Sequence, residues 1–217
     1  MHTQLYMNGG FALQIEISYL PKTSISPIPD AGGHFPFAIE GDCSIFLDTV
    51  PINSEFEEFY PGWMQSLNAF PIYSIIQVHD YTEEDIVNEC TQHNVSYSFM
   101  GSKKYRLIKM TINTTEQFAA LFSYIQGSGN MNDLSMWSLH EDVFSLSKRS
   151  VKGFFKNTET DVIMVINLTT SSSVFWVGYD GDWITLLTNN LKFETEEDVE
   201  KTFPEGFSTE LIEYEDE

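Results

Sequence analysis

Residues 174–187 read VFWVGYDGDWITLL, and this stretch predicts two antiparallel strands joined by a tight turn. Residues 174–179 and 183–187 are rich in aromatic and branched side chains, which are typical of strands. Asp180-Gly181 between them is a pair that favours a short hairpin turn, because both residues tolerate a positive φ. Hairpins in this second half of the chain indicate an antiparallel sheet with helices packed on one face.

The clearest predicted helix covers residues 114–127. Its apolar side chains recur at the i, i+3, i+4 and i+7 spacing of one helix face: Phe118, Leu121, Phe122 and Ile125. Thr114 and Thr115 precede Glu116, a pattern typical of a helix start, and Gly127 is expected to end the helix.

Three times the sequence places a strand before a threonine with acids and then a helix, over residues 72–93, 107–126 and 183–203. We therefore expect an α+β fold, a mostly antiparallel sheet with three or four short helices packed on it. Two α+β subdomains could divide near Gly101-Ser102, into an acidic half at 1–102 and a half at 103–217 with hairpins and an acidic C-terminal block. The alternative is a single domain with one continuous sheet.

The charge is strongly unbalanced, with 32 acidic residues against 11 basic ones and a net charge of −21. Residues 23–102 contain twelve acids and no lysine or arginine, and residues 191–217 contain eleven acids and two bases. Direct binding to nucleic acid or to an anionic membrane is disfavoured, because both need clustered cations. A basic protein partner is favoured instead.

The N-terminal residues show no basic segment followed by an apolar core, and no apolar run is long enough to span a bilayer. Cys43 and Cys90 form no CxxC motif and are too few for a disulfide framework. We therefore expect a cytoplasmic protein.

No HExxH, GxSxG, P-loop or GxGxxG motif is present, so neither a cofactor nor a metal is predicted. His79-Asp80 ends a predicted strand. One interpretation is a catalytic pair, and the other is a turn histidine beside an acid at the start of a helix. The three possible metal ligands His140-Glu141-Asp142 are consecutive on a predicted strand, so they cannot converge on one ion. Cys90 lies on the apolar stripe of its helix and is expected to be buried.

Residues 54–63, SEFEEFYPGW, combine acids with aromatic rings. One interpretation is an amphipathic helix with its aromatic side chains inward and its glutamates in solvent. The other keeps aromatic anchors outward within an acidic rim that suits a basic partner. On the second interpretation the predicted partner-binding residues are Glu55, Phe56, Glu57, Glu58, Phe59, Tyr60 and Trp63.

The leading hypothesis is a non-enzymatic cytoplasmic protein that binds and inhibits a basic protein, such as a toxin or a nucleic-acid-binding enzyme. Immunity proteins, antitoxins and anti-defence proteins have this kind of composition, and some imitate the charge of DNA. The alternative is a hydrolase that uses His79 and Asp80 with nearby carboxylates. A third hypothesis places the function in the basic segment at 103–109, extended by Lys148-Arg149. The oligomeric state is left open.

Overall fold

The hairpin of residues 173–188 forms the middle of a large sheet. The structure is a computed structural model that describes residues 13–21, 35–51, 56–102, 105–152 and 158–213. Within these ranges nine strands follow one another across the main sheet: β12 (Phe207–Leu211), β1 (Leu13–Tyr19), β3 (Ile45–Pro51), β11 (Ile184–Thr188), β10 (Ser173–Val177), β7 (Ser135–Leu139), β4 (Ile72–Gln77), β6 (Arg106–Ile112) and β5 (Ser96–Gly101). Neighbouring strands are antiparallel except β1 and β12, which are parallel.

The predicted hairpin is confirmed. Val177 of β10 pairs with Ile184 of β11, and a short 3₁₀ turn, η2 (Tyr179–Gly181), joins the strands. Asp180 and Gly181 both have a positive φ, of 63° and 68°. Every residue of β10 and β11 is buried, so the side chains on both faces of these two strands lie in the interior.

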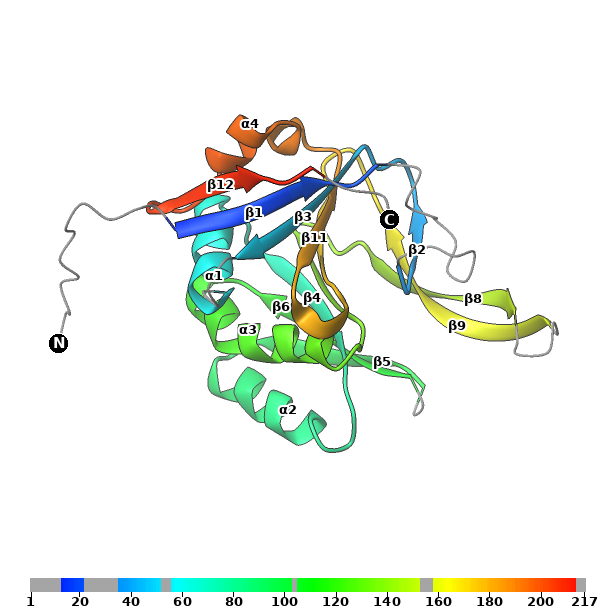
Figure 1. Cartoon of the computed structure of the whole chain (residues 1–217). Helices are drawn as coiled ribbons and strands as arrows, with labels where there is room; N and C mark the ends of the chain where they lie inside the picture. The colour runs from blue at the N-terminus through cyan, green and yellow to red at the C-terminus, as the bar shows by residue number, and fades with distance from the viewer. Residues whose placement is uncertain (1–12, 22–34, 52–55, 103–104, 153–157, 214–217) are drawn as a thin grey trace.

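Helices cover one face of the main sheet (Figure 1). The described residues form four α-helices, α1 (Phe56–Ser66), α2 (Glu83–Gln92), α3 (Thr115–Asn130) and α4 (Glu196–Glu200), and a second 3₁₀ turn, η3 (Leu191–Phe193). Phe175 and Val177 of β10 belong to the hydrophobic core beneath these helices. The α+β class, with a mostly antiparallel sheet and helices packed on it, is confirmed.

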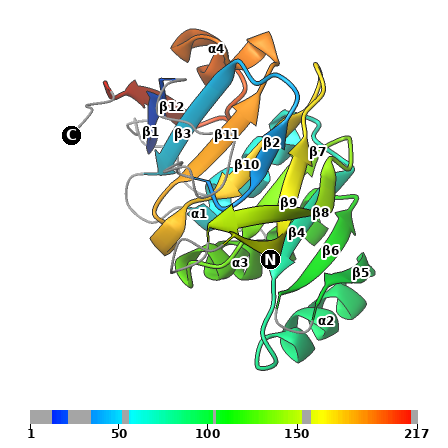
Figure 2. The same cartoon turned by 90° about the vertical axis from the view of Figure 1, so that its right-hand side faces the viewer.

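A second, smaller sheet covers the opposite face (Figure 2). It contains β2 (Ala38–Glu40), β9 (Thr158–Asn167) and β8 (Phe144–Lys152). Val174 and Trp176, which alternate with Phe175 and Val177 along β10, belong to the core between the two sheets. The sequence predicts helices as the cover of the main sheet, and this second sheet is an additional layer.

The central part of the chain has the connectivity of a ferredoxin-like unit. Its elements run β4–α2–β5–β6–α3–β7, and the strands lie in the order β7-β4-β6-β5. Segments before and after this unit add the other five strands. Gly101-Ser102, the expected subdomain boundary, lies at the end of β5 before its antiparallel partner β6. Residues 1–102 and 103–217 therefore both contribute strands to one sheet.

Gly127 does not end its helix, contrary to the prediction. Helix α3 continues to Asn130, and Gly129 is buried against β10. A Cβ on Gly129 would lie 2.2 Å from Val177 Cγ1, so glycine is needed for this close approach. The chain leaves the helix at Asn132, which has a φ of 60°.

Two of the three predicted threonine caps form. The hydroxyls of Thr114 and Thr195 accept hydrogen bonds from the amides of Gln117 and Asp198, at 3.3 and 3.2 Å. Thr82 does not cap α2, because its hydroxyl accepts from the amide of His79 at 3.1 Å.

The strand predicted to contain His140-Glu141-Asp142 is also wrong at these residues. His140 has a φ of 64°, and residues 140–143 separate β7 from β8, which belong to different sheets. His140-Glu141-Asp142 is therefore an exposed turn rather than part of a strand. Glu141 accepts hydrogen bonds from the hydroxyls of Thr169 and Ser171, at 3.0 and 3.1 Å.

Candidate functional site

The aromatic side chains of the predicted binding run face the core. Phe59, Tyr60 and Trp63 of α1 are each 0% exposed, so a partner cannot reach them as anchors. The hydroxyl of Tyr60 lies 2.8 Å from that of Thr49, and burial raises the pKa of Tyr60. The burial agrees with the interpretation in which the aromatic residues of this helix point inward.

The described acids of the same run, unlike its aromatic residues, face the solvent. Glu57 and Glu58 are exposed on the first turn of α1, where they meet the positive end of the helix. Glu55 and the side chain of Phe56 lie outside the described residues. Of the seven predicted partner-binding residues, the structure thus presents Glu57 and Glu58 to solvent.

Helix α1 packs against the segment that joins α4 to β12. The ring of Phe59 lies 4.9 Å from that of Phe203 and 5.1 Å from that of Phe207, measured between centroids. The indole Nε1 of Trp63 donates to Thr202 Oγ1 at 2.7 Å. The acidic helix near residue 57 and the acidic C-terminal block, far apart in the sequence, are therefore neighbours in space.

We call the carboxylates around α4 and β12 the acidic edge. Strand β12 is the terminal strand of the main sheet, α4 lies beside it, and η3 and β1 flank them (Figure 1). The acidic edge consists of Glu16, Glu194, Glu196, Glu197, Asp198, Glu200, Glu205, Glu210 and Glu213. Residues 194–213 contain one base, Lys201, whose Nζ lies 3.1 Å from Glu197 and 3.2 Å from Asp198.

Hydrogen bonds hold α4 on β12. Thr209 of β12 donates to Glu196 Oε1 at 3.1 Å and also lies 2.7 Å from Glu200 Oε2. Glu16 and Glu210 occupy paired positions on β1 and β12, and like charges at neighbouring strand positions disfavour folding. The acidic edge therefore gathers negative charge at a cost in stability.

The negative field of the acidic edge reaches the neighbouring strand β1. Burial raises the pKa of Tyr19 to about 12, and the charges of Glu196, Asp198 and Glu194 act in the same direction. The hydroxyl of Tyr19 donates to the carbonyl of Phe193 at 3.2 Å, which places it beside η3 and α4.

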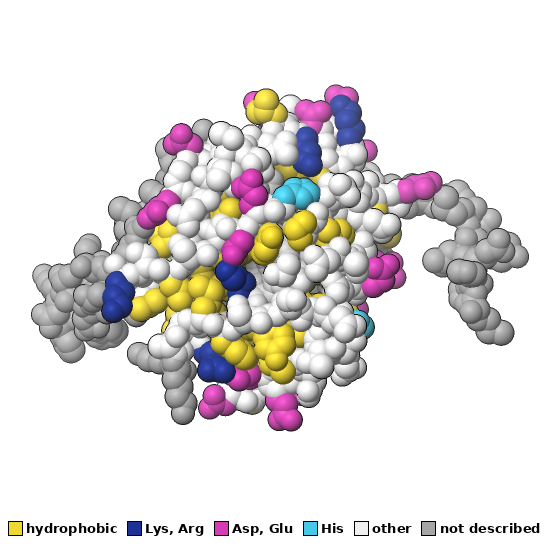
Figure 3. All heavy atoms as spheres, turned by 180° about the vertical axis from the view of Figure 1, so that it is seen from behind, with side chains coloured by type: hydrophobic (Ala, Val, Ile, Leu, Met, Phe, Trp, Pro, Cys, Tyr) yellow, Lys and Arg dark blue, Asp and Glu magenta, His cyan; other side chains and the backbone are white. Residues whose placement is uncertain are grey.

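Two described bases outside the acidic edge are paired with acids. Arg106 forms a two-point ion pair with Glu83, and Lys109 Nζ lies 2.6 Å from Asp142 Oδ2. On the face shown in Figure 3, most of the few lysine and arginine side chains lie near an acidic one. Lys148 is exposed, whereas Lys103, Lys104 and the side chain of Arg149 lie outside the described residues. The described part of the hypothetical basic patch is largely neutralised.

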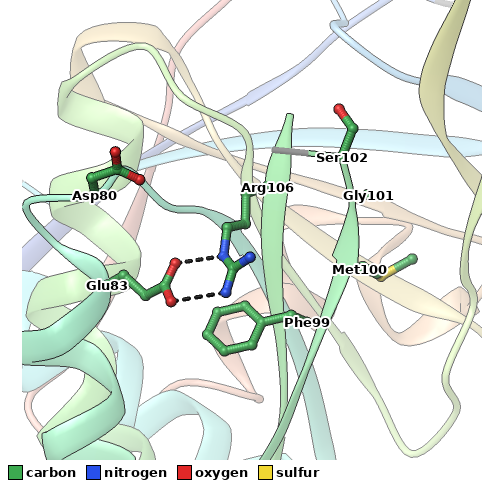
Figure 4. Close-up of a pocket in the computed structure, with 7 residues that line it drawn as sticks. All are labelled: Asp80, Glu83, Phe99, Met100, Gly101, Ser102 and Arg106. Carbon is green, nitrogen blue, oxygen red and sulfur yellow. Dashed lines mark hydrogen bonds and ion pairs between the residues drawn. The ribbon is translucent and has the colours of Figure 1, made fainter. Parts of the chain in front are cut away.

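His79 and Asp80 face different neighbours. His79 Nε2 lies 2.7 Å from Asp133 Oδ2, and its ring stacks on Tyr81 with centroids 5.3 Å apart. Asp80 lines a hollow of about 400 Å³ that also contains the Glu83–Arg106 pair (Figure 4). The other lining residues are Phe99, Met100, Gly101 and Ser102. His79 and Asp80 therefore do not face each other as one pair, and His79 contacts Asp133 instead.

A second hollow lies between α2 and α3, beside the end of β4. It encloses about 260 Å³ and is mainly apolar. Its lining residues are Ile76, Gln77, Val78, Thr82, Ile86, Ser123, Tyr124, Gly127, Ser128 and Met131. We call it the α2–α3 hollow. No local sequence pattern marks this hollow, because its wall is built from three elements. Gly127, which lines it, was predicted to end a helix.

Within the described residues, no group of three or more His, Cys, Asp or Glu side chains is arranged to hold a metal ion. None of the helices in the described ranges has the length and apolar composition needed to cross a bilayer. A scan against protein-family models, a search of curated proteins and a search of solved structures each found no match.

Proposed function

We propose that this protein binds a basic protein through its acidic edge and thereby inhibits it. The observation that carries the proposal is the concentration of nine carboxylates on β1, α4, β12 and the residues between them, with Lys192 of η3 and Lys201 as the neighbouring bases. Such a surface attracts a cationic partner and speeds its association. A toxin or a nucleic-acid-binding enzyme would present such a cationic surface.

Inhibition follows from competition for the same cations. A nucleic-acid-binding site neutralises phosphates with lysine and arginine side chains. Carboxylates on a rigid strand and helix offer comparable charge, so the acidic edge would occupy that site in place of DNA or RNA.

The test compares two variants with the same net charge. The edge variant is Glu194→Gln, Glu197→Gln and Glu205→Gln, and the control variant is Asp42→Asn, Glu84→Gln and Asp182→Asn. All six side chains are exposed, so both variants should fold. Each protein is immobilised, exposed to extract of the source cells at low salt and eluted with a salt step.

We expect the native protein and the control variant to retain the same basic protein, which the edge variant binds roughly tenfold more weakly. DNA or RNA added to the extract should displace that partner. Equal retention by the edge and control variants would show that only overall charge matters. Retention that does not change with salt would contradict the electrostatic mechanism.

A further inference from the structure

The α2–α3 hollow is smaller than a typical small-molecule site. Its volume of about 260 Å³ lies below the roughly 300–1,000 Å³ of most ligand pockets. A pocket that accepts a single side chain is a common feature of protein interfaces, where a buried anchor residue supplies much of the affinity. The size of the hollow therefore favours one side chain over a small molecule.

Gly127 keeps this hollow open. A Cβ built on Gly127 meets nothing within 4 Å, whereas Gly129, two residues later, is packed tightly against Val177. Glycine inside a helix costs roughly 1 kcal/mol relative to alanine. Packing within the protein explains why position 129 is a glycine. It does not explain the glycine at position 127, whose effect is to leave the hollow open.

Exposed apolar side chains adjoin the hollow. Met131 lines it and is 46% exposed, and Tyr81, which is 70% exposed, lies with its hydroxyl 3.7 Å from Met131 Sδ. The His79–Asp133 contact and the stacking of His79 on Tyr81 hold this part of the rim in place. Apolar surface thus continues from inside the hollow to its mouth.

Helix α2, which forms one wall of the hollow, carries four acids: Glu83, Glu84, Asp85 and Glu89. Burial raises the pKa of Tyr124, a wall residue, and the charges of Glu89 and Asp85 on α2 act in the same direction. An occupant with positive charge beside an apolar group is therefore favoured. A second copy of this chain, with a net charge of −21, is disfavoured by repulsion.

We propose that the α2–α3 hollow receives one large apolar side chain of the basic partner, flanked in the partner's sequence by lysine or arginine. This inference rests on the proposed function only in taking the partner to be basic. It reverses the arrangement expected from residues 54–63, because the partner supplies the anchor and this protein supplies the pocket.

The test uses labelled peptides of the form Lys-Lys-Xaa-Lys-Lys, with Trp, Leu or Ala at the central position, and measures binding by fluorescence anisotropy. The Gly127→Leu variant fills the hollow from its wall. The control is Ala119→Leu, which adds the same side chain to an exposed position of the same helix. A third variant, Met131→Ser, removes apolar surface at the rim and leaves the core intact.

We expect the native protein and Ala119→Leu to bind the Trp or Leu peptide at least tenfold more tightly than the Ala peptide. This preference should vanish in Gly127→Leu and fall several-fold in Met131→Ser. A native protein without preference, or a preference that persists in both hollow variants, would overturn the inference. So would a concentration-dependent dimer in sedimentation that Gly127→Leu abolishes, because a second copy would then be the occupant.

The two proposals fail separately. The edge variant should lose the partner in the extract experiment while its peptide preference, a ratio of affinities, stays unchanged. If the native protein showed no peptide preference, the pocket proposal would be rejected and the acidic-edge proposal would stand. If the edge and control variants retained the partner equally, the acidic-edge proposal would be rejected and the pocket proposal would stand.

Discussion

Trp63 Nε1 donates a hydrogen bond to Thr202 Oγ1 at 2.7 Å, and this contact joins α1 to the segment before β12. The hydroxyl of Thr202 in turn donates a hydrogen bond to the carbonyl of Val199 at 2.6 Å, so it both accepts and donates. Trp63 is fully buried, and its ring also packs on Phe203 and Phe175. Two acidic regions are thus held together by a contact between an indole and a hydroxyl.

Thr202→Val should destabilise the protein by about 1–3 kcal/mol, because it leaves the buried N–H of Trp63 without a partner. Urea unfolding followed by fluorescence measures the free energy of unfolding. In a Trp63→Phe background, which lacks the N–H, the same Thr202→Val change should cost less. Equal costs in the two backgrounds would show that the hydrogen bond does not contribute.

Two glycines of one helix should respond oppositely to alanine. Gly127→Ala should raise the free energy of unfolding by about 0.5–1 kcal/mol, because the new methyl group meets open space and glycine disfavours a helix. Gly129→Ala should lower it by about 1–3 kcal/mol, because its methyl group overlaps Val177. Denaturant unfolding of both variants makes the comparison. A stable Gly129→Ala protein would contradict the close approach of α3 to β10.

Tyr19 should make the protein less stable at alkaline pH. Its pKa is about 12 in the folded state against 10.0 ordinarily, so the folded chain keeps a proton that the unfolded chain loses. The stabilisation is complete below pH 10 and is lost as the pH rises from 10 through 12.

The phenolate absorbance of the native protein minus that of Tyr19→Phe gives this titration directly. Glu194→Gln should move the midpoint slightly toward the ordinary value, because one of the neighbouring charges is removed, while burial keeps most of the shift. A midpoint near 10 in the native protein would contradict the structure around this hydroxyl.

The two thiols should differ in reactivity. Cys90 is fully buried, and burial, with the charge of Glu89 as a smaller cause, raises its pKa to about 11. Because the thiolate is the reactive form, iodoacetamide at neutral pH should leave Cys90 unmodified until the protein unfolds. Cys43 is only partly buried and should be alkylated in the folded protein. Mass spectrometry of Cys43→Ser would show fast labelling if Cys90 were accessible.

Local patterns predicted the elements whose structure depends on near neighbours. The Asp180-Gly181 hairpin is confirmed because turn chemistry and strand composition both act within 14 residues. The helical spacing of Phe118, Leu121, Phe122 and Ile125 is confirmed because all four side chains face one core. In these segments local preference and tertiary packing agree.

The sequence-based predictions failed mainly where contacts between distant residues determine the structure. A proline inside a helix removes one backbone hydrogen bond, yet α1 continues through Pro61, because the carbonyl freed at Glu57 lies on an exposed turn. Gly127 was expected to stop α3, but the fit of Gly129 to Val177 determines how that helix packs. The pairing of Trp63 with Thr202 and the order of nine strands involve partners that no short window contains.

The parallel pairing of β1 with β12 has a consequence for how this protein is made. Residues 13–17 leave the ribosome well before their partners at 207–211, which lie 194 positions later in the chain. The ferredoxin-like unit at 72–139 has all its strands available earlier, so it can fold while synthesis continues. The acidic edge, in contrast, does not exist until β12 is added. Under the proposed function, a chain translated only as far as α4 cannot yet present the complete acidic edge, and the pairing of β12 with β1 completes it.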